Sequence, residues 1–343
     1  MSRRFDRLLV AGAAGFIGSN FVRLLRRERP ETEVWVLDKL TYAGNPANLA
    51  EFEGQTGYRF VQGDICDQSL VDQLAAEVDA IVNFAAETHV DRSLMEPFAF
   101  VNTDVLGTAV LCEAARRHRH QVFHLVSTDE VYGDVPEGRS VEDDALRPRS
   151  PYAASKAGGE HLARAYGVSH GLPLLITRGS NNYGPFQYPE KSVPVFITNA
   201  IDDLPIPLYN DGSAVRDYCF VEDHCRGIDT VLHDAPVGGV YNLGTGVETS
   251  GNELAALVCD LLEKPRSLIQ YVADRPGHDY RYAVDASRAR ALGWAPQVDF
   301  RSGLERTVRW YVEHEDWWRP LKSGDYWEYY RRNYRPLVPH ESA

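Results

Sequence analysis

The chain has 343 residues (38.5 kDa), enough for one large or two fused domains, and its 44% hydrophobic content excludes a disordered or fibrous protein. Its 36 basic and 49 acidic residues give a net charge of -13, so general binding to nucleic acid or to an anionic membrane is not expected. There is no long apolar run that predicts a transmembrane helix. The charged first residues lack a signal-peptide core, so we expect a cytoplasmic protein.

The chain contains five cysteines, an odd number without a C-x-x-C spacing: Cys66, Cys112, Cys219, Cys225 and Cys259. This pattern predicts reduced, mostly buried thiols in a reducing compartment. Cys219 and Cys225 could form part of a metal site, but no matching His or Cys cluster follows them. We therefore expect no metal.

The first half of the chain alternates apolar segments of strand length with longer amphipathic segments. Strands are predicted at residues 7–11, 33–37, 59–62, 80–85, 122–127 and 174–177, and helices at 16–27, 69–76, 98–117 and 152–170. Such alternation is typical of a parallel sheet covered by helices on both faces. The expected fold class is α/β, a Rossmann-type doubly wound parallel sheet with a smaller C-terminal substrate-binding α/β domain.

The pattern is more interrupted after residue 180. A loop is predicted at 181–192, strands near 208 and at 216–221 and 238–243, and helices from 222 and at 252–263. We predict two parts, residues 1–180 and 181–343, that share a cleft, with some later segments returning to the first part. Core packing or a partner surface explains the tail tryptophans better than a ligand site does: Trp310, Trp317, Trp318 and Trp327.

A glycine-rich turn, Gly12–Gly18, connects the first predicted strand to the first helix. Small residues let the backbone approach a pyrophosphate, which the free N–H groups of the helix start would bind. Asp38 ends the second strand 20 residues later, where a carboxylate accepts ribose hydroxyls and repels a 2′-phosphate, so NAD is favoured over NADP despite the adjacent Lys39. Asp64 and Ile65 follow the third strand, where the adenine would lie. The alternative is a simple turn followed by an unrelated strand-end acid.

Tyr152 and Lys156 are four residues apart in a predicted helix and therefore project from one face. A neighbouring ammonium is expected to lower the pKa of the tyrosine toward neutrality, which would make it a base for an alcohol proton. Thr128, at the end of the preceding strand, is placed to hydrogen-bond the reacting hydroxyl. The alternative is that the tyrosine and the lysine are two surface residues of a helix that have this spacing by chance.

The sequence resembles the extended short-chain dehydrogenase/reductases and, within them, the dTDP-glucose 4,6-dehydratase family, from about Leu8 to about Tyr311. The motifs that carry the resemblance are Gly12–Gly18, Asp38–Asn45, Ala85–Ser93, Ser127–Gly133, Arg178–Pro185 and Arg275–Asp279. The resemblance implies NAD as the cofactor, dTDP-glucose as the substrate and a 4-keto-6-deoxy product. It also implies a homodimer in which helices 101–117 and 152–170 pair.

Asp129 and Glu130 separate this family from its relatives. The resemblance implies that Glu130 removes the C5 proton after C4 is oxidised, while a protonated Asp129 protonates the leaving C6 hydroxyl. Adjacent acids in a closed site cannot both ionise easily, so one is expected to be protonated. A nucleotide-sugar 4-epimerase or a UDP-glucuronate decarboxylase would keep Tyr152 and Lys156 without needing this pair. An NAD-binding sensor without catalysis would be expected to have lost either the Tyr-x-x-x-Lys motif or the glycine-rich turn, and both are intact in this sequence.

The resemblance implies a full set of site residues. The catalytic set is Thr128, Asp129, Glu130, Tyr152 and Lys156. The cofactor set is Gly12, Gly15, Phe16, Ile17, Gly18, Asp38, Lys39, Thr41, Asp64, Ile65, Ala85, Ala86, Thr103, Tyr152, Lys156 and Asn182. The substrate set is Thr88, Thr128, Asn181, Lys191, Ser192, Pro207, Tyr209, Arg216, Asn252, Arg275 and His278; the arginines suit a diphosphate. Departures from the family pattern are Ala11, Ala13, the Ser192-Val193 pair after Lys191, and Asn210 after Tyr209.

Overall fold

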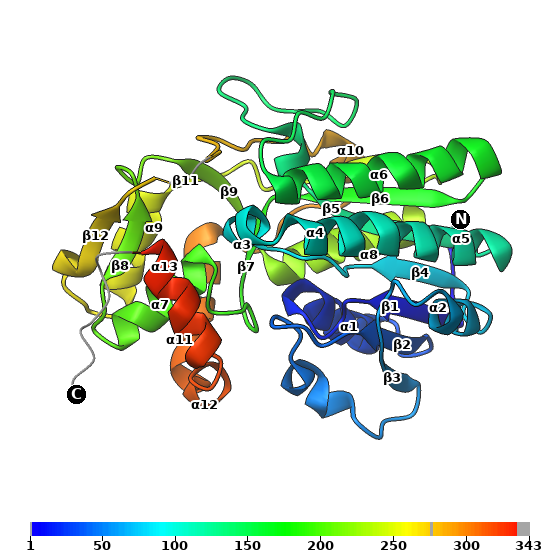
Figure 1. The fold of residues 1–343 in the computed structure, drawn as a ribbon, viewed down its shortest axis with the longest axis horizontal. Helices are drawn as coiled ribbons and strands as arrows, with labels where there is room; N and C mark the ends of the chain where they lie inside the picture. The colour runs from blue at the N-terminus through cyan, green and yellow to red at the C-terminus, as the bar shows by residue number, and fades with distance from the viewer. Residues whose placement is uncertain (1, 275–276, 335–343) are drawn as a thin grey trace.

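The computed structural model describes residues 2–274 and 277–334, and Figure 1 shows a large parallel sheet with a smaller region beside it. The strand order of the large sheet is β10-β6-β5-β4-β1-β2-β3, and all its pairings are parallel. The order reverses between β1 and β4, so the Rossmann-type fold expected from the sequence is confirmed. Its strands are β1 (Arg7–Ala11), β2 (Glu33–Asp38), β3 (Tyr58–Gln62), β4 (Ala80–Asn83), β5 (Val122–Thr128), β6 (Leu174–Gly179) and β10 (Val240–Leu243).

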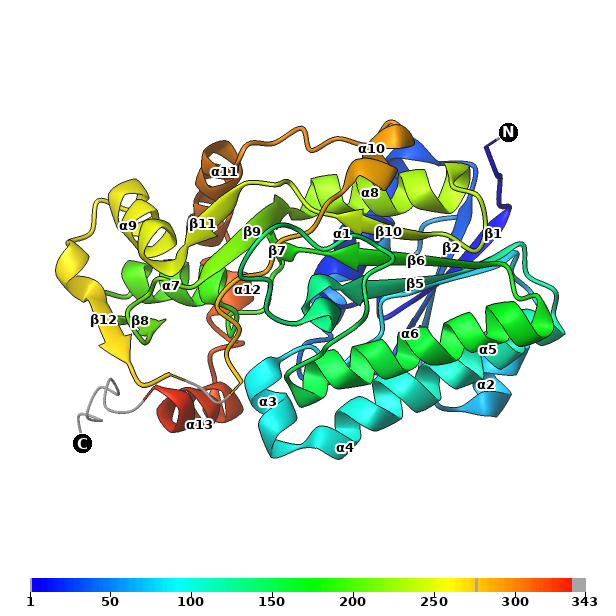
Figure 2. The same cartoon turned by 90° about the horizontal axis from the view of Figure 1, so that it is seen from above.

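Helices cover both faces of this sheet because side chains alternate along each strand (Figure 2). Leu8 and Val10 pack into the core beneath α1 and α8, whereas Leu9 and Ala11 belong to the core beneath α2, α5 and α6. The near-continuous apolar strands reflect this burial on two faces. The helices are α1 (Phe16–Glu28), α2 (Gln68–Ala75), α5 (Thr108–Arg117), α6 (Pro151–His170) and α8 (Val221–Asp234).

The single helix predicted at 98–117 is present, but it contains a π-helical turn. The short helix α4 (Pro97–Phe100) leads into the turn Val101–Gly107 and then into α5. The backbone of α6 packs closely against this turn, since a Cβ on Gly159 would lie 2.5 Å from the carbonyl oxygen of Asp104. A π turn within a helix is frequently found at functional sites. Helix α3 (Val90–Met95) precedes this segment.

The smaller region contains two further sheets and the C-terminal helices. Strands β7 (Asn181–Tyr183), β9 (Val215–Phe220) and β11 (Glu248–Ser250) form one sheet, and β8 (Ile206–Tyr209) pairs with β12 (Ile269–Val272). Trp318 is fully buried and Trp310, Trp317 and Trp327 pack against the same core, as expected for core packing. The helices are α7 (Ser192–Ile201), α9 (Gly251–Leu261), α10 (Ser287–Ala291), α11 (Phe300–Glu313), α12 (Glu315–Trp318) and α13 (Gly324–Asn333).

Three sequence-based expectations were wrong in detail. The predicted loop 181–192 begins with a strand, because Asn181–Tyr183 pairs with Tyr218–Phe220 far along the chain. Helix α7 was not predicted, since its β-branched composition is unfavourable for helices and tertiary burial decides its structure. The strand predicted at 80–85 ends at Asn83. Helix α8 and strand β10 lie in the layers of the large sheet.

Candidate functional site

One cavity opens at the carboxyl ends of the strands of the large sheet, beside the point where the strand order reverses. All predicted cofactor residues and all five predicted catalytic residues line it, together with Thr88, Asn181 and Lys191 from the substrate set. Sequence reasoning missed several lining residues: Glu87, Gln187, Tyr188, Glu190 and His224. Of these residues, Glu87 would have been the easiest to predict from the sequence, because it directly follows the predicted cofactor residues Ala85 and Ala86, just after β4.

The glycine-rich turn forms a backbone cradle at the start of α1. A Cβ on Gly12 would lie 2.4 Å from the amide nitrogen of Ala85, and one on Gly18 would lie 2.5 Å from the carbonyl oxygen of Gly12. Gly12 also has a φ of 76°, which favours glycine. Gly15 is the N-cap and has no side chain to bind the first-turn amides. These amides and the positive end of the helix can therefore bind an anion such as a pyrophosphate.

Asp38 lies at the end of β2, and its carboxylate is held in place by backbone amides. Its Oδ2 accepts a hydrogen bond from Ala14 N and its Oδ1 one from Leu40 N, both at 2.8 Å. Burial raises its pKa, and these two hydrogen bonds act in the opposite direction. Lys39 Nζ pairs with Asp64 Oδ2 at 2.7 Å, so its charge is already balanced. The arrangement fits an unphosphorylated ribose and would repel a 2′-phosphate.

The Tyr-x-x-x-Lys segment forms the first turns of α6. Ser150 caps this helix by accepting a hydrogen bond from Ala153 N at 3.1 Å, which places Tyr152 at the cavity. Lys156 is buried, and its Nζ donates to the carbonyl oxygen of Val126 at 2.9 Å. The Thr128 side chain lies within hydrogen-bonding reach of the Tyr152 side chain. The phenol, the ammonium and the threonine hydroxyl thus meet at one end of the cavity.

The expectation that Lys156 lowers the pKa of Tyr152 is wrong for this arrangement. Desolvation raises the pKa of Tyr152 well above its usual value, and the negative charges of Glu130 and Asp104 raise it further. The hydrogen bond from Thr128 acts in the opposite direction but does not offset these effects. A phenolate at neutral pH therefore requires further positive charge beside Tyr152.

Asp129 and Glu130 begin a short 3-10 turn that follows β5. Thr128 Oγ1 accepts a hydrogen bond from Glu130 N and donates one to Asp129 Oδ1, both at 3.3 Å. Burial raises the pKa of Asp129 well above its usual range, and the nearby charges of Glu130 and Asp217 raise it further. Asp129 is 3% exposed, so a neutral carboxyl is favoured there at neutral pH. The pair therefore offers one proton donor beside one carboxylate.

Most of the predicted substrate residues from the smaller region do not line the cavity. Arg216 donates to the carbonyl oxygens of Val215, Asp279 and Tyr280 at 2.8 to 3.0 Å, so it fixes backbone. The other described residues outside the lining are Ser192, Pro207, Tyr209, Asn252 and His278. Tyr209 and His278 pack against each other with ring centroids 5.9 Å apart. Arg275 lies outside the described residues.

Comparisons with known proteins identify the family of the chain. The family model described as GDP-mannose 4,6 dehydratase matches residues 9–307. A dTDP-glucose 4,6-dehydratase of Streptomyces niveus is 51% identical over 324 residues, which cover 93% of this chain and 96% of the relative.

Solved structures give the same result. The structure of a dTDP-glucose 4,6-dehydratase from Streptomyces venezuelae with NAD and dTDP bound is 50% identical, has a TM-score of 0.90, and matches over 92% of this chain and 100% of its own. A UDP-glucose 4-epimerase of Thermus thermophilus in complex with NAD is 34% identical, with a TM-score of 0.83, and matches over 90% of this chain and 99% of its own. The family match and these identities show that the chain belongs to the GDP-mannose 4,6-dehydratase family, within the extended short-chain dehydrogenase/reductases.

Proposed function

We infer that this protein is an NAD-dependent dTDP-glucose 4,6-dehydratase, which converts dTDP-glucose to dTDP-4-keto-6-deoxyglucose in deoxysugar biosynthesis. The observation that carries this inference is the Asp129–Glu130 pair, one buried acid and one carboxylate beside Tyr152 in a single cavity. Sequence identity of about 50% to enzymes of that name supports dTDP-glucose as the substrate. A UDP-glucose 4-epimerase is also similar, but less so. A C4 epimerisation removes no water, so it would not need the Asp129–Glu130 pair.

The proposed cofactor is NAD, held by the Gly12–Gly18 cradle and by Asp38. When bound, NAD supplies the hydride acceptor for oxidation at C4 and the hydride donor for C6. Burial and two carboxylates raise the pKa of Tyr152, and the positively charged nicotinamide ring of bound NAD would favour the phenolate, as Lys156 does.

The residues of the chain divide the chemistry into two stages. Tyr152 takes the proton of the 4-hydroxyl, and Thr128 hydrogen-bonds the reacting group. The resulting 4-ketone acidifies the C5 proton, which Glu130 removes. Asp129 gives its proton to the C6 hydroxyl as this leaves as water. The raised pKa of Asp129 keeps that proton available at neutral pH.

We propose that residues 1–180, with α8 and β10 returning to them, bind the cofactor and that residues 181–343 bind the nucleotide sugar. The lining of the cavity supports this division. All the predicted cofactor residues in the lining come before residue 183, whereas the predicted substrate residues Asn181 and Lys191 lie at the start of the second part. Lys191 Nζ donates to the carbonyl oxygen of Thr88, which ties the two parts together at the cavity.

A homodimer is also proposed, in which the helices 101–117 and 152–170 pair. Apolar side chains on and beside the first of these, which lies within the helix Pro97–Arg117, are exposed: Leu94 (44%), Phe98 (81%), Val101 (50%) and Leu106 (47%). The helix is long and apolar enough to cross a membrane, but half of it is buried within the protein, which is typical of a core helix. A Phe98→Glu variant should sediment as a monomer if this face pairs with a second copy. A monomeric parent protein at micromolar concentration would contradict the proposal.

We propose a cytoplasmic location because all five cysteines are free thiols, four of them buried. Fractionation of cells should find the protein with the cytosolic enzymes, and recovery from the membrane fraction would contradict this.

The reaction itself is tested by incubating the protein with dTDP-glucose and NAD. A 4-keto-6-deoxy sugar nucleotide should form, which is recognised by its new absorbance in alkali and by a mass lower by one water. A product of unchanged mass with inverted C4 would favour the epimerase.

A further inference from the structure

Tyr282 lies between two carboxylates, those of Glu130 and Asp279. Its hydroxyl donates to Asp279 Oδ2 at 2.7 Å, and its oxygen lies 3.4 Å from Glu130 Oε2. A phenol has one proton, so the short contact to Asp279 holds it. The phenol oxygen can then accept a hydrogen bond whenever Glu130 carries a proton.

We propose that Tyr282 and Asp279 form a proton relay, through which Glu130 releases to solvent the proton that it takes from C5 of the sugar. The inference rests on the proposed role of Glu130 as the C5 base. Glu130 transfers its proton to the Tyr282 oxygen while the Tyr282 proton moves to Asp279. The step leaves Glu130 as a carboxylate, Tyr282 unchanged and Asp279 protonated, so atoms and charges balance.

The relay is buried but ends near the surface. Tyr282 is 3% exposed and Asp279 is 2% exposed. Arg149 Nη1 lies 2.9 Å from Asp279 Oδ1, and the side chain of Arg149 is 50% exposed. Asp279 therefore lies beside a side chain that reaches solvent. The guanidinium has no acceptor, so Asp279 gives its proton directly to water beside Arg149.

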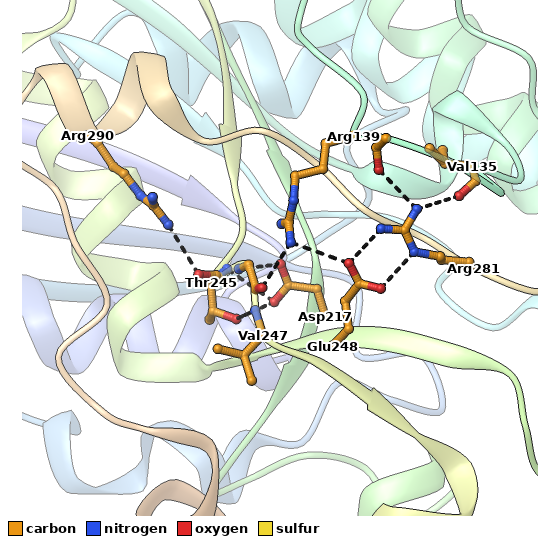
Figure 3. Close-up of polar contacts among 10 residues, drawn as sticks. Val135, Arg139, Asp217, Thr245, Val247, Glu248, Arg281 and Arg290 are labelled. Atoms are coloured by element: carbon orange, nitrogen blue, oxygen red, sulfur yellow. Dashed lines mark hydrogen bonds and ion pairs between the residues drawn. The ribbon is translucent and has the colours of Figure 1, made fainter.

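The surrounding residues hold the relay in place. Arg281, the neighbour of Tyr282, donates to both carboxylate oxygens of Glu248, at 2.6 and 2.7 Å. Figure 3 shows these contacts and the hydrogen bond from Arg281 to the carbonyl oxygen of Val135. On the other side, the Arg216 guanidinium lies 4.4 Å from the Tyr282 ring centroid. These contacts fix the backbone and the ring, so the hydroxyl has little freedom to leave the two carboxylates.

The relay is tested with dTDP-glucose deuterated at C5, incubated with the enzyme and NAD in ordinary water. In the parent enzyme the deuteron passes from Glu130 to solvent, and the product should carry hydrogen at C5. In Tyr282→Phe the deuteron stays on Glu130 and returns to C5 in the last step. The fraction of product that retains deuterium should rise about threefold or more.

Asp279→Asn gives a second test, because an amide accepts the hydrogen bond of Tyr282 but cannot take its proton; retention should rise as in Tyr282→Phe. Tyr280→Phe is the matched control, since Tyr280 lies on the same segment but is 55% exposed, and it should behave like the parent enzyme. Retention equal to that of the parent in both relay variants would overturn the relay. Failure of the parent enzyme to form a keto sugar would instead overturn the proposed function.

A solvent-isotope measurement on the parent enzyme keeps the relay testable if either variant does not fold. The relay moves two protons at once, so the rate at which dTDP-glucose tritiated at C5 releases tritium to the water should fall along a curve as the deuterium content of the water rises. A linear fall would indicate a single proton transfer from Glu130 directly to water and would also overturn the relay.

Discussion

Replacing Asp104 by Asn should change how the stability of the protein depends on pH. Asp104 lies in the π turn beside α6 and is 3% exposed. Burial raises its pKa from 3.8 to about 6, against the lowering effects of Lys156 and of the hydrogen bond from Ser155 at 2.5 Å. The folded protein therefore binds more protons than the unfolded chain between these two pKa values. This contribution to stability is full below pH 3.8 and is lost as the pH rises through about 6.

The magnitude follows from the two pKa values. Between about pH 5 and about pH 8, the free energy of unfolding of the parent protein should fall by roughly 1 kcal/mol through this one group. Asn keeps the shape and can still accept a hydrogen bond from Ser155, but it does not titrate. Relative to the parent, the free energy of unfolding of the variant should therefore rise by roughly 1 kcal/mol over the same pH range, and a constant difference between the two proteins does not affect this change.

Urea unfolding of both proteins at several pH values measures this difference. Glu137→Gln, which removes a charge from an exposed side chain, serves as the control and should differ from the parent by the same amount at each pH. A difference between Asp104→Asn and the parent that does not change with pH would refute the reasoning, because Asp104 would then titrate alike in the folded and unfolded chains.

Three further predictions concern the cavity. Tyr152→Phe should lose the oxidation step by roughly 10²-fold or more, measured as formation of bound NADH on mixing with dTDP-glucose, and a near-normal rate would mean that another group is the base. Asp129→Asn and Glu130→Gln should accumulate bound NADH, seen as absorbance at about 340 nm that decays slowly, whereas parent-like turnover in both would remove the pair from the mechanism. Asp38→Ala should weaken NAD binding by about tenfold and reduce discrimination against NADP, measured by calorimetric titration, and unchanged affinity would contradict its proposed ribose contact.

The nucleotide-binding half of the fold was predictable because its signals are local. The alternating strands and helices, the Gly12–Gly18 turn and Asp38 all lie within short segments, and the parallel sheet brings their ends to one edge. The predicted cofactor residues therefore all line one cavity. The smaller region was harder to predict, because β7 pairs with β9 across more than thirty residues and α7 depends on burial rather than on propensity.

The charge environment of the site residues could not be predicted from their spacing in the sequence. Tyr152 and Lys156 are close in sequence, but Lys156 donates to the backbone of Val126, and the acids that raise the pKa of Tyr152 come from other segments. Arg216 gives a second example, because its guanidinium binds backbone carbonyls and stacks on Tyr282 outside the cavity lining. A sequence pattern names such residues but does not show their partners.

In the proposed reaction the hydride that leaves C4 returns to C6 of the same sugar, and deuterium at C4 of dTDP-glucose tests this most directly. After turnover with NAD in ordinary water, the deuterium should be found in the C6 methyl group of the keto product, detected by NMR. An epimerase would return the deuterium to C4, and a simple dehydrogenase would release it on free NADH. Deuterium recovered at C4 or on free NADH, with none at C6, would contradict the account.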